Sequence, residues 1–303
     1  MGGVRASHRL LIYGQLLPAV LVVAFLLGFP FLVLVANGVT TSPAGTVSLW
    51  PLTADHLKSV VEDAYYFQVL ARTCALSAIV TVLAAVLAYP LAIGITNTRS
   101  RTLRVIYIVA SLAPLMTSVV IRAFGWQVFL GPGGPIANFL VFLFGPQHLR
   151  GILNTPLSMI IGLVHLSLPF MLLMLLPVVV KIDGNVFRAA EVLGASPFQI
   201  FRRVLLPLSM PGLLAGSVVS FSLCATVVVT PTVLGGRQQG VFSMLVYDQI
   251  LRYFNWNLGG ALAVILMVAV GIVAALATKI GHRYYATWIT DADGAGAPAH
   301  APR

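Results

Sequence analysis

Six long apolar runs dominate this chain and limit it to few folds. Each run is long enough to cross about 30 Å of hydrocarbon at about 1.5 Å of rise per helical residue. Internal Pro and Gly residues favour helices over barrel strands, which would alternate in polarity over segments of about ten residues. We predict an all-α polytopic membrane protein with transmembrane helices at Leu10–Ala36, Val69–Thr96, Val105–Ala123, Pro156–Val180, Pro211–Leu234 and Gly259–Thr278.

Acidic side chains are absent from all six predicted helices. The chain has 303 residues, of which 59% are hydrophobic and 9% are charged, whereas soluble domains carry about 25% charged residues. A carrier driven by protons or sodium usually needs a carboxylate inside the membrane. The absence of acids from the predicted helices therefore counts against an ion-coupled carrier. The eight acids are Asp55, Glu62, Asp63, Asp183, Glu191, Asp248, Asp291 and Asp293.

Basic residues are distributed unevenly between the two sides of the membrane. With the N-terminus in the cytoplasm, twelve basic residues lie inside and six lie outside or at its border. Because positive residues accumulate in cytoplasmic connections, both termini are predicted to be cytoplasmic. The net charge of +10 therefore reports topology, and no soluble domain is available to carry a basic patch for nucleic acid.

The connections outside the six helices also carry signals. The first apolar run exceeds the 7 to 15 residues of a signal peptide, which predicts an uncleaved first helix. Two shorter segments, Ile136–Phe144 and Val241–Phe254, are predicted to form interfacial helices at the outer surface. Residues 1–290 are expected to form a single transmembrane domain, and residues 291–303, rich in Ala, Gly and Pro, are expected to form a disordered cytoplasmic tail.

A helix–glycine–helix pattern lies in the polar connection 181–210 between the fourth and fifth predicted helices. Val186–Leu193 is rich in helix formers and follows a possible cap at Asn185. Gly194 suits the left-handed position that ends a helix. Ser196 and Gln199 form a Ser-x-x-Gln capping box around the proline that opens the second helix.

The second helix of this connection has one apolar face. Phe198, Phe201, Val204 and Leu205 share that face by helical spacing, and Pro207 is expected to end the helix. An apolar surface should therefore lie beneath this face.

The same connection resembles a known signature. Permease subunits of binding-protein-dependent ABC importers carry E-A-A-x-x-x-G-x9-I-x-L-P, and the spacing is kept here in full. Arg188 stands where the signature has its first acid, and Glu191 lies three residues further on. The matching positions are Arg188-Ala189-Ala190, Gly194, Val204 and Leu206-Pro207.

Further motifs look like the spermidine/putrescine-type branch of that family. One departure is that Thr226-Val227-Val228 lacks the acid often found there, which removes a cation partner. The motifs are Tyr89-Pro90-Leu91-Ala92; Pro114, Ser118, Arg122, Trp126, Leu130 and Asn138; Val229-Thr230-Pro231; Leu234-Gly235-Gly236; and Trp256-Asn257-Leu258-Gly259.

The resemblance implies a type I (MetI-like) importer permease fold in the bacterial inner membrane. It implies a solute path through the membrane, a coupling helix in 181–210, and no catalytic residues. The expected partners are two ATPase subunits that bind ATP and Mg, a second related permease and an external solute-binding protein. This chain has no G-x-x-x-x-G-K-[ST] sequence, so ATP is expected to bind only the partner.

The implied solute is a polyamine, and several alternatives stay open. Another small organic solute or ferric iron would suit the same class of importer. A stand-alone secondary carrier is the competing class, and an intramembrane enzyme is disfavoured because no H-E-x-x-H or G-x-S-x-G motif occurs. Transport without ATP or partners would indicate the carrier.

The resemblance assigns two groups of residues, and no metal site or cofactor of the chain's own is predicted. The ATPase-coupling group is Arg188, Ala189, Ala190, Glu191, Leu193, Gly194, Ala195, Phe198, Phe201, Val204, Leu206 and Pro207. The path or gate group is Arg122, Trp126, Thr230 and Pro231.

Each path residue also has a purely structural interpretation. Arg122 could instead snorkel and pair with a loop acid, and Trp126 could be an interfacial anchor. Pro231 could mark a break that exposes backbone to a cavity or a plain helix end. His165 lacks a second metal-type ligand at helical spacing, which favours a hydrogen-bonded core histidine.

Overall fold

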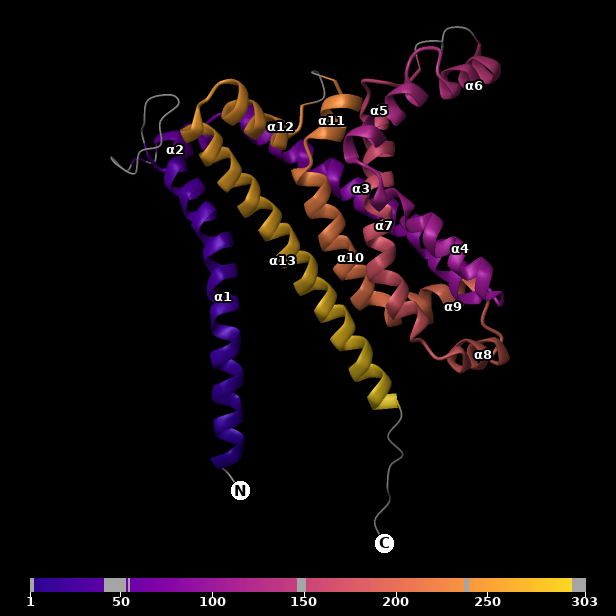
Figure 1. The fold of residues 1–303 in the computed structure, drawn as a ribbon. Helices are drawn as coiled ribbons and strands as arrows, with labels where there is room; N and C mark the ends of the chain where they lie inside the picture. The colour runs from indigo at the N-terminus through magenta and orange to yellow at the C-terminus, as the bar shows by residue number, and fades with distance from the viewer. Residues whose placement is uncertain (1–2, 41–52, 54, 146–150, 237–239, 296–303) are drawn as a thin grey trace. The chain divides into compact units, whose positions relative to one another are not determined.

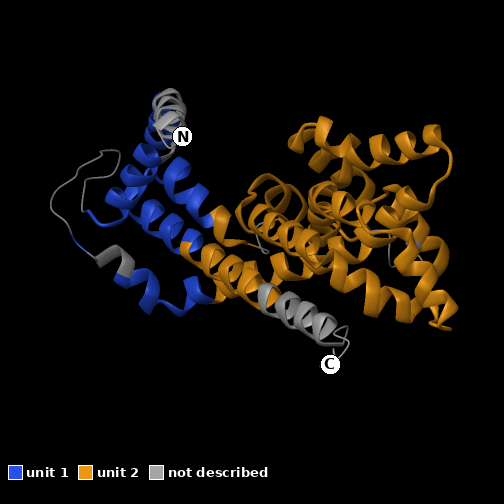
Figure 2. Cartoon of the chain, turned by 90° about the horizontal axis from the view of Figure 1, so that it is seen from below, with its two compact units in different colours: residues 1–67, 245–267 blue, residues 68–244, 268–303 orange. Residues whose placement is uncertain are grey.

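The computed structural model of the chain describes residues 3–40, 53, 55–145, 151–236 and 240–295 (Figure 1). Every regular element in this described part is a helix, as predicted. The chain folds as two compact units, shown in Figure 2: Met1–Phe67 with Leu245–Met267, and Gln68–Met244 with Val268–Arg303.

Six apolar segments of the described residues are long enough to cross a membrane, which confirms the predicted number. The segment Pro156–Val180 coincides with its prediction, and the first lies inside helix α1 (Gly3–Gly38). The six are Val20–Gly38, Ala64–Asn97, Val119–Leu143, Pro156–Val180, Pro197–Thr226 and Trp256–Gly281.

In the first unit, α1 and the start of α13 (Trp256–Ala295) approach closely. A Cβ placed on Gly38 would lie 2.9 Å from the backbone nitrogen of Ala261, and one on Gly260 would lie 2.9 Å from the carbonyl oxygen of Leu34. Only glycine permits this backbone contact. Helix α2 (Asp55–Glu62) belongs to the same unit.

The core of the second unit is built on α7 (Pro156–Val180), which packs against α3 (Ala64–Asn97) and α10 (Leu206–Thr226). Lipid tails are as apolar as the side chains, so close van der Waals packing holds such helices together. Gly212 and Gly216 provide it: a Cβ on Gly212 would lie 2.7 Å from the Met174 carbonyl oxygen, and one on Gly216 would lie 2.6 Å from Met171 Sδ.

The predicted third span, Val105–Ala123, is wrong as a single helix. The chain forms α4 (Arg101–Leu112), a 3-10 turn (Ala113–Met116) and α5 (Val119–Leu130), with Thr117 extended between the last two. Pro114 offers no N–H to a continuing helix. Its carbonyl oxygen accepts instead from Thr117 Oγ1 at 2.9 Å and from the Arg122 guanidinium.

The predicted end of a helix at Pro207 is also wrong. Short α9 (Pro197–Ile200) continues through a π-helical turn, η3 (Phe201–Leu205), directly into α10. The Leu206 N–H bonds to the Phe201 carbonyl five residues back. A π-helical turn already departs from the regular i to i−4 bonding of the helix, so the missing N–H of Pro207, in the first turn of α10, is accommodated there.

The predicted fifth span, Pro211–Leu234, breaks at Val227. The ψ angle of Val227 is 136°, and α11 (Val229–Leu234) begins just beyond it. The sequence left two possibilities at Pro231, a break in the helix or a plain helix end. The structure has a break, but it lies at Val227, four residues before Pro231. Pro231 lies in the first turn of α11, where the helix tolerates it.

The two short outer helices predicted from the sequence are present. They are α6 (Pro135–Phe144) and α12 (Phe242–Tyr247), the latter followed by a π-helical turn, η5 (Asp248–Arg252). Between the fourth and fifth spans lies α8 (Gly184–Val192). Helix α13 runs to Ala295, into the segment expected to be disordered, and residues 296–303 lie outside the described part.

Substituting Gly212 with Ala should destabilise the contact between α7 and α10. The new methyl group would meet the Met174 carbonyl oxygen, and overpacking of this kind costs about 1–3 kcal/mol. Gly94→Ala is the matched control, because Gly94 lies in a helix with nothing within 4 Å of an added Cβ. Thermal unfolding in detergent should show a lower Tm for Gly212→Ala only; equal Tm values would contradict the contact.

Candidate coupling loop and translocation path

Helix α8 starts at a carboxylate cap. Asp183 Oδ1 accepts the backbone N–H of Asn185 at 2.9 Å, so Asp183 is the N-cap and the predicted cap at Asn185 is wrong. The negative carboxylate of Asp183 is a better acceptor at the positive end of a helix than the neutral amide of Asn185. The helix therefore starts at Gly184, two residues before the predicted start at Val186.

The glycine stop after α8 is confirmed. Gly194 has φ +79°, in the left-handed region. The N–H of Ala195 bonds to the Ala190 carbonyl at 3.0 Å, and the N–H of Gly194 bonds to the Glu191 carbonyl at 2.9 Å. These two bonds satisfy carbonyls that the helix end would leave without partners.

The capping box of the next helix is also confirmed. Ser196 Oγ accepts the Gln199 N–H at 3.3 Å, and Gln199 Oε1 accepts the Ser196 N–H at 2.8 Å. With the cap on Asp183 and the stop at Gly194, local hydrogen bonds fix both helices of the connection. The ends of both helices are therefore defined by hydrogen bonds within the connection itself.

The predicted apolar face of the second helix divides in two. Phe201 packs edge-on against Tyr89 with ring centroids 5.2 Å apart, and Leu205 is 5% exposed. Tyr89 in turn shares a hydrogen bond of 2.8 Å with Ser209. Phe198 instead is 69% exposed, because the π-helical turn after it changes the register of the face.

An aliphatic tip projects from the end of α8. Val192 is 88% exposed and Leu193 is 86% exposed, and Arg188 and Glu191 are exposed on the same helix. Leu193 belongs to the predicted coupling group, whereas Val192 was missed. The position of Val192, two residues before the glycine that ends the helix, could have identified it. Exposed apolar side chains on a capped loop are typical of a docking surface.

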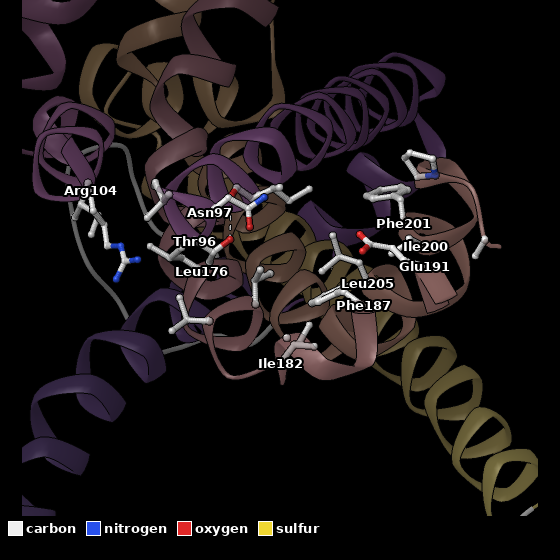
Figure 3. Close-up of a pocket in the computed structure, with 18 residues that line it drawn as sticks. Thr96, Asn97, Arg104, Leu176, Ile182, Phe187, Glu191, Ile200, Phe201 and Leu205 are labelled. Carbon is white, nitrogen blue, oxygen red and sulfur yellow. Dashed lines mark hydrogen bonds between the residues drawn. The ribbon is translucent and has the colours of Figure 1, made fainter. Parts of the chain in front are cut away.

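Behind this loop lies a cavity of about 1050 Å3 (Figure 3). The end of α3, the start of α4, the end of α7 and the connection 181–205 enclose it. Most of its lining is apolar. Its polar and charged lining residues include Thr96, Asn97, Arg104 and Glu191.

The predicted path residues Arg122 and Trp126 lie on α5. Trp126 Nε1 donates a hydrogen bond of 3.0 Å to His165 Nδ1 on α7, which confirms the hydrogen bond expected for this histidine, although His165 is only half-buried. The Arg122 guanidinium donates a hydrogen bond to the carbonyl oxygen of Pro114, which the helix break leaves without a helical partner. One expectation from the sequence was that Arg122 would pair with a loop acid instead.

Thr230 and Pro231, the other two predicted path residues, are buried on α11. A Cβ on Gly162 of α7 would meet the side chains of Thr230 and Leu234. Helix α11 also packs along α5. The structure therefore brings α5 and α11, which follow the breaks in the third and fifth spans, together on α7.

Comparison with known proteins agrees with this architecture. Residues 80–280 match the family model described as the binding-protein-dependent transport system inner membrane component. The chain belongs to this family. It is a membrane-spanning transport subunit of an ABC importer.

Two permease proteins named PotB, of spermidine/putrescine transport systems, are similar along most of the chain. The one from Haemophilus influenzae is 30% identical over 249 residues, covering 82% of this chain and 86% of that protein. The one from Escherichia coli K12 is 30% identical over 211 residues, covering 70% and 76%. The trehalose permease SugA of Mycobacterium tuberculosis is 26% identical over 288 residues, covering 92% and 91%.

Solved structures show the same fold. A bacterial alginate ABC transporter in complex with an alginate-bound periplasmic protein contains a chain with a TM-score of 0.73 and 19% identity, covering 92% of this chain and 96% of that one. The MetNI methionine transporter gives a TM-score of 0.51 and 19% identity, covering 70% and 93%. The predicted MetI-like permease fold is thus confirmed.

The Trp126–His165 hydrogen bond should stabilise the contact between α5 and α7. Trp126→Phe leaves His165 Nδ1 without its donor, which should cost about 1–3 kcal/mol of unfolding free energy. The double variant with His165→Phe should cost less than the sum of the two single variants, with a coupling of about 1 kcal/mol. Chemical unfolding in detergent measures this, and strictly additive effects would contradict the bond.

Proposed function

We propose that this chain forms one half of the membrane path of a polyamine importer. A second, related permease would supply the other half, and an external binding protein would deliver spermidine or putrescine. Two ATPase subunits would bind ATP and Mg and supply the energy. The similarity to two PotB permeases at 30% identity supports the solute class.

Orientation of the chain follows from its charges. Both termini and the connection 181–210 lie in the cytoplasm in this proposal, because twelve of the eighteen basic residues then face inward. The aliphatic tip at Val192 and Leu193 is then available to a cytoplasmic ATPase.

One observation carries the proposed coupling mechanism: the helix from Pro197 to Thr226 is continuous. It begins at the capping box beside the exposed tip and ends at the break before α11. A displacement of the tip by an ATPase would therefore move the far end of this helix as one body, and with it the contacts of α11 with α5 and α7.

The solute path is proposed to run beside these helix breaks. Arg122, Trp126, Thr230 and Pro231 would border it, since irregular backbone inside a membrane is tolerated where it lines a cavity or is buried in protein. An indole face and backbone carbonyls suit an ammonium group better than an anion. Another small organic solute or ferric iron is the alternative within the same importer class.

Gly194→Asp should abolish ATP-dependent uptake by the assembled importer. An aspartate at φ +79° occupies a backbone region that L residues adopt less readily than glycine, and its charge would lie at the docking surface. Uptake of radiolabelled spermidine into proteoliposomes holding both permeases, the ATPase and the binding protein is the measurement.

Gly184→Asp is the matched control in this assay, because Gly184 lies in the first turn of α8 in open space. It introduces the same charge where an acid is favourable, and it should retain uptake. Transport by this chain alone, without ATP or partners, would contradict the proposal and indicate a secondary carrier. Normal uptake by Gly194→Asp would contradict the part assigned to the loop.

A further inference from the structure

Basic side chains are frequent in the connection that carries the exposed tip. Residues 181–207 contain four basic and two acidic residues. Three of the basic residues are arginines, Arg188, Arg202 and Arg203, and all three side chains are exposed. The loop therefore combines an aliphatic tip with a net positive charge.

The two acids of the loop leave this positive charge largely uncompensated. Asp183 is engaged in capping α8, where its carboxylate accepts from the backbone and side chain of Asn185. Glu191 borders the cavity behind the loop. Among the described residues, no carboxylate lies within ion-pair distance, 4.0 Å, of any of the three loop arginines.

We propose that the ATPase surface that docks on this loop is acidic. Its carboxylates pair with Arg188 and with the pair Arg202 and Arg203, around an apolar hollow that receives Val192 and Leu193. This inference rests on the proposed function and specifies its partner: an apolar centre with a charged rim is the usual anatomy of such an interface. Arginine suits it, because its planar guanidinium binds a carboxylate through two hydrogen bonds.

Anionic lipid headgroups are the other surface that attracts arginines. Two features favour a protein. The tip lies between a capped helix and a glycine stop, so local hydrogen bonds define its backbone, and a recessed protein surface can be complementary to it. Glu191 lies one helical turn from Arg188, and a layer of anionic headgroups would repel it, whereas a protein surface can place its own charges selectively.

Charge reversal at Arg188 tests the inference. Both permeases are co-expressed with the ATPase of the same importer, and ATPase binding is measured in nanodiscs at increasing NaCl. Arg188→Glu should weaken ATPase binding about tenfold, the equivalent of about 1.4 kcal/mol. Binding of the unaltered complex should weaken as NaCl rises, because screening acts on exposed charge pairs.

Matched variants separate the alternatives. Arg101→Glu reverses an exposed charge in the first turn of α4, outside the loop, and should leave ATPase binding unchanged. Replacing single carboxylates of the ATPase by lysine should restore binding to Arg188→Glu at one position. An unchanged Tm for Arg188→Glu excludes misfolding as the cause of its loss.

Three results would overturn the inference. The first is equal ATPase binding by Arg188→Glu and Arg101→Glu; the second is restoration by no carboxylate-to-lysine change. The third is a loss that disappears in nanodiscs of neutral lipid, which would assign Arg188 to headgroups. Leu193→Asp distinguishes failure of this inference from failure of the proposed function. If the Leu193→Asp variant also binds the ATPase normally, the ATPase does not dock at the tip at all.

Discussion

Inside a bilayer, each backbone N–H and C=O must find a partner within the protein, and this requirement determines where the chain can leave the helical path. Two spans do so. In the third, Thr117 and Arg122 supply the partners for the Pro114 carbonyl that the break leaves open. In the fifth, the chain turns at Val227, and the Ser243 hydroxyl donates to the Val227 carbonyl at 2.9 Å. Each departure from helix is thus compensated by a specific side chain.

The second of these departures is linked to the exposed loop by one continuous helix. The segment from Pro197 to Thr226 starts outside the predicted membrane core, passes Pro207 by means of a π-helical turn, and packs closely on α7 through Gly212 and Gly216. In the proposed mechanism, this helix carries a displacement from the coupling loop at one end to the break at Val227 at the other. We propose that this arrangement lets the permease respond to a separate ATPase subunit.

Local signals in the sequence predicted local structure well. Gly194 and the pair Ser196 and Gln199 form the stop and the capping box that their residue types indicate, because these bonds involve only near neighbours. Effects of proline were harder to predict. Pro114 breaks its helix and Pro207 does not, and the difference depends on the turn preceding each residue. The Trp126–His165 bond joins residues 39 positions apart, so only the tertiary fold reveals it.

In the proposed mechanism, the Pro197–Thr226 helix moves as one rigid body when the importer binds ATP. Spin labels at Gln199 and Thr226, both exposed, would report its length in a complex whose two native cysteines, Cys74 and Cys224, have been replaced. The distance between the labels should be the same with and without ATP, while the distance from Thr226 to a label at Val128 on α5 should change. A change between Gln199 and Thr226, with none between Thr226 and Val128, would contradict the claim.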